Sequence, residues 1–155
     1  MTIIKRETEI QSTCEQVWAH VIDFEKMPIW FYGVKRVSVL SPELGVGTER
    51  LVTIITGRAY RERFVHWETN KSFSFIVLDP PLFIKEWAAF VNLRPTFDSV
   101  ILRWEIHYTM RYGSLGKMLD RLLLAPIMNR VLLLSLKRLK TVVERENLSQ
   151  KALQA

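Results

Sequence analysis

Tyr60, Glu62, Phe64 and His66 alternate along one stretch of the sequence, and three of the four have side chains that could perform acid–base chemistry. General acid–base catalysis needs a titratable group inside a cavity, where the loss of water shifts its pKa. Every second residue of a strand lies on one face, so these four could form a polar stripe within an apolar pocket. In the competing register the residues between them are buried, which leaves Glu62 and His66 in water. The outward register is favoured for His66, and both registers stay open for Glu62.

Tyr108 is the second candidate for such chemistry. It lies in a stretch where every second residue is apolar, namely Leu102, Trp104, Ile106, Tyr108 and Met110. Period two with one apolar face is typical of a half-buried antiparallel strand. A buried tyrosine needs a partner for its hydroxyl, either a backbone carbonyl of the core or an oxygen of a bound ligand. Tyr108 and Glu62 are therefore the candidate catalytic residues.

No pattern in the sequence predicts a metal or nucleotide site. The histidines His20, His66 and His107 are far apart, and Cys14 is the single cysteine. Metal-binding motifs usually show closer spacing, such as H-x-x-x-H or C-x-x-C. The glycines at 45 and 47 form a lone turn motif, without the lysine and hydroxyl residue of a phosphate loop. We therefore expect no metal and no cofactor.

The chain has 155 residues, which is the size of one ordinary domain. We expect a single domain over residues 1–155, with a core from about 3 to 147 and a loose tail at 148–155. The 22 basic residues outnumber the 16 acidic ones but are scattered, which is typical of a solvated surface and predicts no nucleic-acid partner. The N-terminus lacks a secretion signal, no apolar run is long enough to cross a membrane, and a single cysteine fits a reducing compartment. A cytoplasmic location is therefore expected.

Strands dominate the sequence up to residue 110. β-Branched residues and rough alternation predict a first strand at 2–11, after which Ser12 or Thr13 supplies a helix N-cap. A short helix is expected at 13–22, followed by a second short helix or turn at 23–30 that Pro28 interrupts. Six further strands span residues 34–40, 48–56, 59–67, 72–78, 83–93 and 97–110. Glycine or proline marks each break between them except the predicted hairpin loop at 68–71.

The stretch from Ser114 to Glu146 has its leucines and valines at helical spacing, and it is apolar on more than one side. Pro126 removes a backbone donor and disfavours helical geometry at the residue before it. We therefore expect a kink or break there, with a short lid-like segment at 115–124 and a long helix at 127–146. The aliphatic residues Leu133 and Leu134 exceed what one buried face requires.

Seven antiparallel strands can bury one long helix only if their sheet curves around it. The sequence thus predicts an α+β fold, in which a curved seven-stranded antiparallel sheet wraps around a long C-terminal helix and two short helices follow the first strand. A curved sheet seldom fills the space between itself and the helix. Such spaces are where small ligands bind.

Several local motifs occur in a familiar order: T-x-E-Q-V-W at 13–18, D-F-E-K-M-P-x-W at 23–30, a Gly-x-Gly turn at 45–47 and R-E-R-F-V-H-W at 61–67. W-E-I-H-Y at 104–108 and L-K-R-L-K-T-V-V-E at 136–144 follow. Over roughly residues 3–147 the sequence resembles the START-like (SRPBCC) superfamily, and within it the polyketide cyclase/dehydrase and lipid-transport branch. The resemblance implies a helix-grip fold with a deep hydrophobic cavity for lipids, quinones, sterols or polyketides. It does not fix the activity, since the superfamily includes cyclases, aromatases and carriers that only bind.

Our leading hypothesis is that the chain binds a hydrophobic small molecule, such as a lipid, quinone or polyketide-like compound, between the sheet and the C-terminal helix. The candidate ligand-binding residues come from the predicted strands and helix: Tyr60, Phe64, Trp87, Trp104, Ile106, Tyr108, Met110, Leu122, Asn129 and Leu132. Asn129 interrupts the apolar helix, and it could either anchor a ligand or be exposed.

Two alternative functions stay open. The first is a polyketide cyclase or aromatase without metal or nucleotide cofactor, which uses Glu62 or the cavity tyrosines. The second is a module that docks on a membrane or a protein through an apolar and basic surface formed by Leu123, Leu133, Leu134, Lys137, Arg138 and Lys140. The surplus apolar surface would also suit a homodimer.

Overall fold

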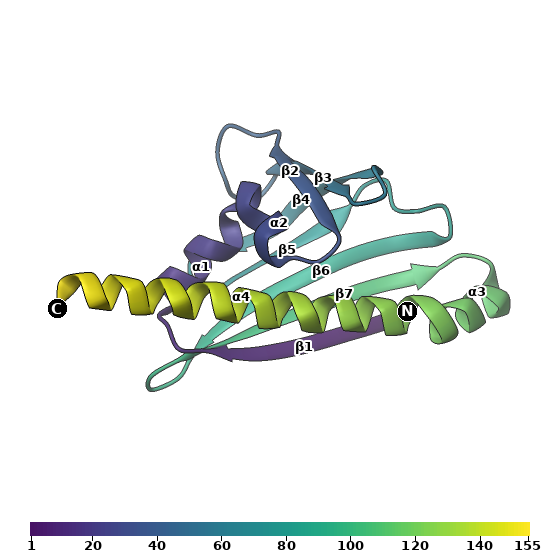
Figure 1. Cartoon of the computed structure of the whole chain (residues 1–155). Coiled ribbons are helices and arrows are strands. Elements are labelled where there is room, and N and C mark those ends of the chain that lie inside the picture. Colours follow the sequence, from purple (N-terminus) through teal and green to yellow (C-terminus); the bar gives the residue numbers. More distant parts are fainter.

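One antiparallel sheet of seven strands curves around a long C-terminal helix, as the sequence predicts (Figure 1). The computed structural model describes residues 1–155. The strand order is β1-β7-β6-β5-β4-β3-β2, so the first and last strands are neighbours and the others follow as a meander. Their bounds are β1 Thr2–Ile10, β2 Val34–Val39, β3 Glu49–Ile54, β4 Ala59–Glu68, β5 Ser72–Val77, β6 Ile84–Pro95 and β7 Val100–Met110.

Short helical segments cover one end of the concave face of the sheet. Thr13 caps α1 (Cys14–Ile22) by accepting a hydrogen bond of 3.3 Å from the backbone N–H of Gln16. A 3-10 turn, η1 (Phe24–Lys26), and the single turn α2 (Met27–Trp30) follow. Their inward side chains join rings of β4 and β5 in one aromatic cluster, which fills this end of the fold: Trp18, Phe24, Phe64, Trp67, Phe73 and Phe75.

The C-terminal helix is not broken at Pro126, so the expected break is wrong. α3 (Gly113–Leu119) continues through a π-helical turn, η2 (Asp120–Leu124), into α4 (Ala125–Gln154). Pro126 lies in the first turn of α4, directly after the wide π turn. Because a π turn already rearranges the backbone hydrogen bonds, the donor that proline lacks costs little at this place. The segment 115–124 is therefore part of one long helix and not a separate lid.

α4 packs along β1 through a stripe of side chains that are at most 1% exposed, namely Leu132, Leu136, Leu139 and Val143. The C-terminal residues, predicted to be a loose tail, continue α4 as far as Gln154. None of the helices combines the length and the hydrophobicity that a membrane-spanning segment requires.

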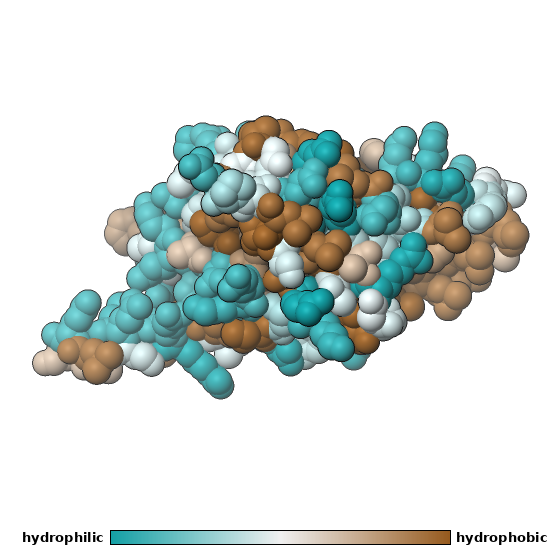
Figure 2. Space-filling view, turned by 90° about the horizontal axis from the view of Figure 1, so that it is seen from above, coloured by the Kyte–Doolittle hydropathy of each residue, from teal (hydrophilic) through white to brown (hydrophobic).

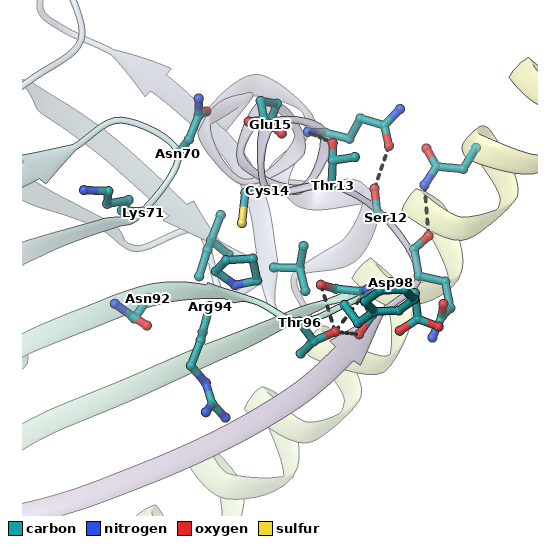
Figure 3. Close-up of a pocket in the computed structure, with 18 of the residues that line it drawn as sticks. Ser12, Thr13, Cys14, Glu15, Asn70, Lys71, Asn92, Arg94, Thr96 and Asp98 are labelled. Atoms are coloured by element: carbon teal, nitrogen blue, oxygen red, sulfur yellow. Dashed lines mark hydrogen bonds between the residues drawn. The ribbon is translucent and has the colours of Figure 1, made fainter.

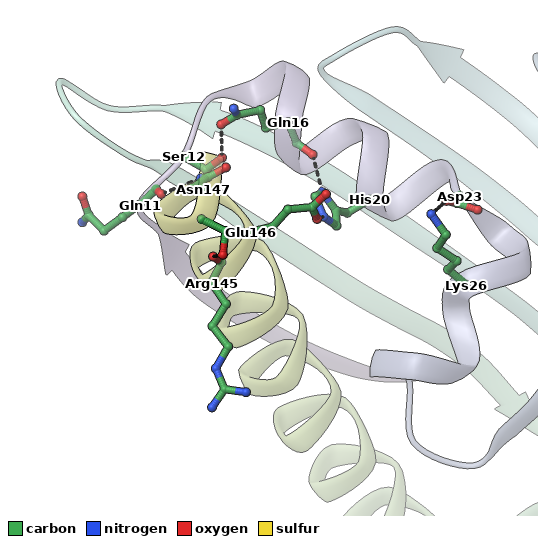
Figure 4. Close-up of polar contacts among 10 residues, drawn as sticks. Gln11, Ser12, Gln16, His20, Asp23, Lys26, Arg145, Glu146 and Asn147 are labelled. Atoms are coloured by element: carbon green, nitrogen blue, oxygen red, sulfur yellow. Dashed lines mark hydrogen bonds and ion pairs between the residues drawn. The ribbon is translucent and has the colours of Figure 1, made fainter. Parts of the chain in front are cut away.

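Contacts between α1, the end of β1 and the last third of α4 hold the short helix beside the long one (Figure 4). The Nε2 atom of His20 pairs with the carboxylate of Glu146, and its Nδ1 lies 2.8 Å from the carbonyl oxygen of Gln16. The side-chain amide of Asn147 donates to the carbonyl of Gln11 at 3.1 Å. These contacts fix α1 and the end of β1 against the last third of α4.

Candidate functional site

An apolar cavity of about 390 Å³ lies between the concave face of the sheet and the beginning of α4. Of the 23 residues that line it, 20 are hydrophobic. The sheet contributes residues of β2 to β7, and the helical side contributes Leu124, Ile127, Met128 and Val131. The aromatic cluster fills the neighbouring part of the concave face. The open space is therefore confined to the part of that face which the start of α4 covers.

The structure brings five of the predicted site residues together around this cavity: Tyr60, Glu62, Trp87, Trp104 and Ile106. Six other predicted site residues are not among the lining residues, namely Phe64, Tyr108, Met110, Leu122, Asn129 and Leu132. Most of the lining residues lie in strands where every second side chain points inward. Strand periodicity could therefore predict some of them.

A bulge in β4 decides which of its residues face inward. The register between β4 and β5 shifts between Phe64 and His66. As a result Glu62 and Phe64 point inward by alternation, and Trp67 also points inward, three residues after Phe64. Val65 and His66 are exposed, and His66 lies 2.9 Å from the hydroxyl of Ser72. Neither of the two simple registers is therefore correct along the whole strand.

Phe64 belongs to the aromatic cluster and not to the cavity wall. It stacks on Phe24 with the ring centroids 5.2 Å apart, and it contacts Phe73 edge-on. Leu132 is fully buried in the stripe that packs α4 on β1. Leu122 lies on the outer side of the helix and is 66% exposed. Asn129 faces β1, where its Oδ1 accepts a hydrogen bond of 2.7 Å from Nε of Arg6.

The polar group in the cavity wall is Glu62, which is paired with a buried arginine. Arg50 on β3 stands opposite Glu62 in the register of β3 and β4, and its Nε donates to Oε2 of Glu62 at 2.6 Å. The guanidinium also lies over the rings of Phe24, Phe64 and Phe75, at 4.4, 5.0 and 4.8 Å from their centroids. An arginine desolvated in this way is stabilised by the carboxylate and by the three negative ring faces.

One oxygen of the Glu62 carboxylate accepts no hydrogen bond and could accept one from a ligand. Only Oε2 takes part in a hydrogen bond, the one from Arg50, while the side chain itself lines the cavity. Burial raises the pKa of Glu62, and the charge and hydrogen bond of Arg50 oppose that shift only in part. An acceptor in an apolar cavity would select a ligand that carries a hydroxyl or another donor.

Tyr108 uses its hydroxyl to fasten the π turn to the sheet. The hydroxyl donates to Oδ1 of Asp120 at 2.5 Å, and the hydroxyl of Thr2 donates to Oδ2 of the same carboxylate at 2.5 Å. Tyr108 and Asp120 are both buried, and Asp120 opens the π turn. This network holds the first turns of the long C-terminal helical segment on β7 and β1, so the geometry gives Tyr108 a structural role.

We expect the stability of the chain to fall with rising pH above about 10, and part of this fall to come from Tyr108. Burial, and then the hydrogen bond and negative charge of Asp120, raise its pKa above 10.0, the ordinary value. A group with a raised pKa in the folded state stabilises the fold below its ordinary pKa and loses that contribution at higher pH. In Tyr108→Phe, the slope of unfolding free energy against pH should therefore be shallower by up to about 1.4 kcal/mol per pH unit.

The measurement is urea denaturation from pH 9 to 11. At neutral pH, Tyr108→Phe is expected to cost about 1–3 kcal/mol, because Asp120 loses one of its two donors. Tyr112, which is exposed, gives the matched control, and Tyr112→Phe should change neither the stability nor the slope. Equal slopes in the wild type and in Tyr108→Phe would contradict the assignment.

Several lining residues are not among those predicted from the sequence, including Val52, Phe75, Phe83, Ala89 and Ile127. Val52, Phe75 and Ala89 lie on the inward faces of β3, β5 and β6, so alternation along those strands could have identified them. Phe83 precedes β6 and Ile127 lies in the first turn of α4. No local sequence pattern marks these two, since only the path of the C-terminal helix brings them together.

A second, wider hollow of about 920 Å³ lies near the other end of α4 and is mostly polar (Figure 3). Only 4 of its 22 lining residues are hydrophobic. Charges of both signs line it, including Glu15, Lys71, Arg94 and Asp98. An apolar ligand would gain little there, so the cavity beside Glu62 is the better candidate site. No three His, Cys, Asp or Glu side chains are grouped so that they could hold a metal ion.

Comparison with known proteins agrees with this architecture. A family model described as polyketide cyclase/dehydrase and lipid transport matches residues 1–144. No curated protein matches the chain significantly.

Solved structures share the fold at low sequence identity. An aromatase/cyclase from a Streptomyces species is 13% identical with a TM-score of 0.77, and the match covers 93% of this chain and 94% of that one. A protein from Thermobifida fusca is 21% identical with a TM-score of 0.75 and coverage of 94% and 95%. A protein from Thermus thermophilus is 18% identical with a TM-score of 0.75 and coverage of 92% and 97%. At these identities the similarity shows the fold alone.

Proposed function

The chain belongs to the polyketide cyclase/dehydrase and lipid-transport family, and from this membership we propose that it binds a hydrophobic small molecule in the cavity beside Glu62. The observation that carries the proposal is the cavity itself, which is apolar on almost every side and holds one buried carboxylate. The ligand is then an apolar molecule with a hydrogen-bond donor, such as a phenol or an alcohol, at the end that meets Glu62.

The size of the cavity restricts the ligand further. Pockets for small molecules span about 300–1,000 Å³, and a volume of about 390 Å³ lies near the lower end of that range. A compact ring system or a short acyl chain suits this volume better than a lipid with two long chains. The aromatic walls, which include Phe31, Phe75, Trp87 and Trp104, favour a flat unsaturated ligand.

A second candidate function, cyclase activity, is favoured by one specific feature. The carboxylate of Glu62 has a raised pKa and a free oxygen in the cavity, which is what a general base for aldol chemistry requires. On this view Glu62 removes a proton from a carbon next to a carbonyl of a poly-ketone chain, and the carbanion attacks a second carbonyl of the same chain. The alkoxide that forms then takes the proton back from Glu62, which restores the carboxylate. Arg50 would keep the carboxylate oriented.

One experiment tests both candidates. The delipidated protein is incubated with a series of hydroxylated aromatic compounds and with a short poly-ketone, and is then examined by native mass spectrometry and solvent extraction. Recovery of one bound compound per chain, unchanged, supports the binding function. Recovery of a cyclised product, lost in Glu62→Gln, supports the cyclase. If no compound of either series stays bound, both candidates are wrong.

A further inference from the structure

The outer side of α3 and η2 carries a row of exposed hydrophobic side chains. Leu115, Met118, Leu119, Leu122 and Leu123, which we call the docking face, are 58%, 53%, 46%, 66% and 57% exposed. They are spaced three or four residues apart or are direct neighbours, so they form one stripe along the helix. Figure 2 shows hydrophobic side chains gathered at the end of the molecule where α3 lies. A stripe of this kind on a surface usually meets a partner.

The packing of the opposite side of the helix keeps this stripe exposed, because that side is fixed against the rest of the fold. The inward positions are Gly116 and Asp120, one turn apart. A Cβ at Gly116 would come within 2.0 Å of the carbonyl oxygen of Arg111, so the backbone of α3 lies directly on the chain that precedes it. Asp120 is fixed by the hydroxyls of Tyr108 and Thr2. The side of the helix that could be buried is thus occupied by a glycine and a hydrogen-bonded carboxylate, and the leucines have no place inside.

Exposed basic residues flank the docking face along the chain. Four basic residues lie between positions 111 and 130: Arg111, Lys117, Arg121 and Arg130. None of the four forms an ion pair within the chain. The single acid in this segment, Asp120, is buried and accepts two hydrogen bonds, so it does not offset the charge at the surface. Exposed leucines flanked by unpaired cations match the two layers of an anionic membrane, the acyl chains and the headgroups.

A second copy of the chain fits this face less well. A symmetric dimer would place the same patch of both subunits against each other. The unpaired cations around each docking face would then meet cations and would be partly desolvated without a partner. An anionic lipid surface removes that conflict, since it supplies the opposite charge.

The docking face is also continuous with the candidate site. Leu124 and Ile127 follow it on the same helix, and both line the cavity. Ile127 is 55% exposed, so its side chain belongs both to the cavity wall and to the surface. A surface that engages a bilayer through Leu122 and Leu123 would bring this wall of the cavity to the membrane interface.

We propose that the chain binds peripherally to anionic membranes through the docking face and its flanking cations, with the cavity wall at Leu124 and Ile127 turned toward the lipid. This face shares Leu123 with the surface expected from the sequence, but the other residues of that surface lie further along α4. There Leu133 and Leu134 are half-buried, Arg138 stacks on Tyr32 at 4.2 Å, and Lys140 contacts Glu144 at 3.0 Å. The proposal goes beyond the proposed function, because the docking face would bind a membrane whether or not the cavity holds a ligand.

The test is flotation of the full chain with vesicles of phosphatidylcholine alone and of phosphatidylcholine mixed with phosphatidylglycerol. Binding is expected only to the anionic vesicles and should weaken with added salt. Lys117→Gln/Arg121→Gln should reduce the partition coefficient about 30-fold, since one basic residue near an anionic surface contributes about a fivefold effect. The matched control, Lys137→Gln/Arg145→Gln, changes two exposed cations of α4 and should leave binding within about threefold of the wild type.

A second pair of variants separates the leucines from the charges. Leu115→Ser/Leu119→Ser/Leu122→Ser should reduce binding more than about tenfold, whereas Leu148→Ser/Leu153→Ser, at exposed positions near the chain end, should not. Circular dichroism checks that each variant is folded. The proposal is wrong if anionic vesicles do not bind the wild type, or if the control variants lose as much binding as the docking-face variants. A different result would also contradict it: the wild type is a dimer, the triple leucine variant is a monomer, and neither protein binds vesicles.

Discussion

Arg50→Met is expected to destabilise the fold by about 3–5 kcal/mol, a large part of the stability of a domain of this size. The methionine can occupy the space between Phe24, Phe64 and Phe75, so little packing is lost. What is lost is the only hydrogen-bond partner of Glu62, whose side chain is 11% exposed. A buried carboxylate without a partner is destabilising, because it loses its hydration and forms no hydrogen bond or ion pair that compensates.

The pH dependence of this variant gives an internal check. Burial already raises the pKa of Glu62 in the presence of Arg50, and removal of the cation should raise it further. A carboxyl group with a raised pKa in the folded state costs stability once the pH is high enough to ionise it. The deficit of Arg50→Met relative to the wild type should therefore be largest at neutral and alkaline pH and should shrink as the solution is acidified. Urea denaturation followed by tryptophan fluorescence measures it.

Two further variants test whether the loss of stability comes from the unpaired charge of Glu62 or from the removal of an arginine as such. Arg50→Met/Glu62→Leu removes both charges and should recover to within about 1–2 kcal/mol of the wild type, or exceed it. The neighbouring pair on the outer face of the same strands, Arg63 and Glu49, is joined at 2.6 Å but is 49% and 22% exposed. Arg63→Met should cost at most about 1 kcal/mol. Equal losses in Arg50→Met and Arg63→Met would refute the view of Glu62 as a buried charge.

The fold could be predicted from the sequence because most strands of this chain bury one face. In β7 the buried and half-buried residues alternate from Val100 to Thr109, and that regular pattern fixes both the strand and its inward side. The stripe from Leu132 to Val143 likewise fixes the buried side of α4. Chain-wide agreement between such local patterns is what specifies the curved sheet and its helix.

The site could be predicted only in part, because two local irregularities and one buried charge determine it. The bulge in β4 turns both Phe64 and Trp67 inward, which no alternation rule anticipates. The π turn before Pro126 carries the helix past a residue expected to break it. Arg50 was overlooked as well, since a charged residue in a strand usually faces water and only its cross-strand partner explains its burial.

Ala89→Phe is expected to weaken ligand binding about a hundredfold while leaving the fold intact. Ala89 lines the cavity, is 1% exposed, and stands opposite Phe75 on one neighbouring strand and Ile106 on the other. A phenyl group at this position would project into the space that the ligand needs. If the ligand forfeits apolar contacts equivalent to one fully buried side chain, about 3 kcal/mol, its affinity falls about a hundredfold.

The matched control is Ala88→Phe, one residue earlier and on the opposite face of β6. It adds the same group to the same strand but outside the cavity, so binding should stay within about threefold of the wild type. Stability without ligand distinguishes a cavity from a packed core. A phenyl group that enters open space should leave the unfolding free energy unchanged or raise it, whereas one forced into packed side chains costs about 1–3 kcal/mol. A destabilised Ala89→Phe that still binds ligand as the wild type does would show that the ligand lies elsewhere, and the polar hollow near the end of α4 would then be the next site to test.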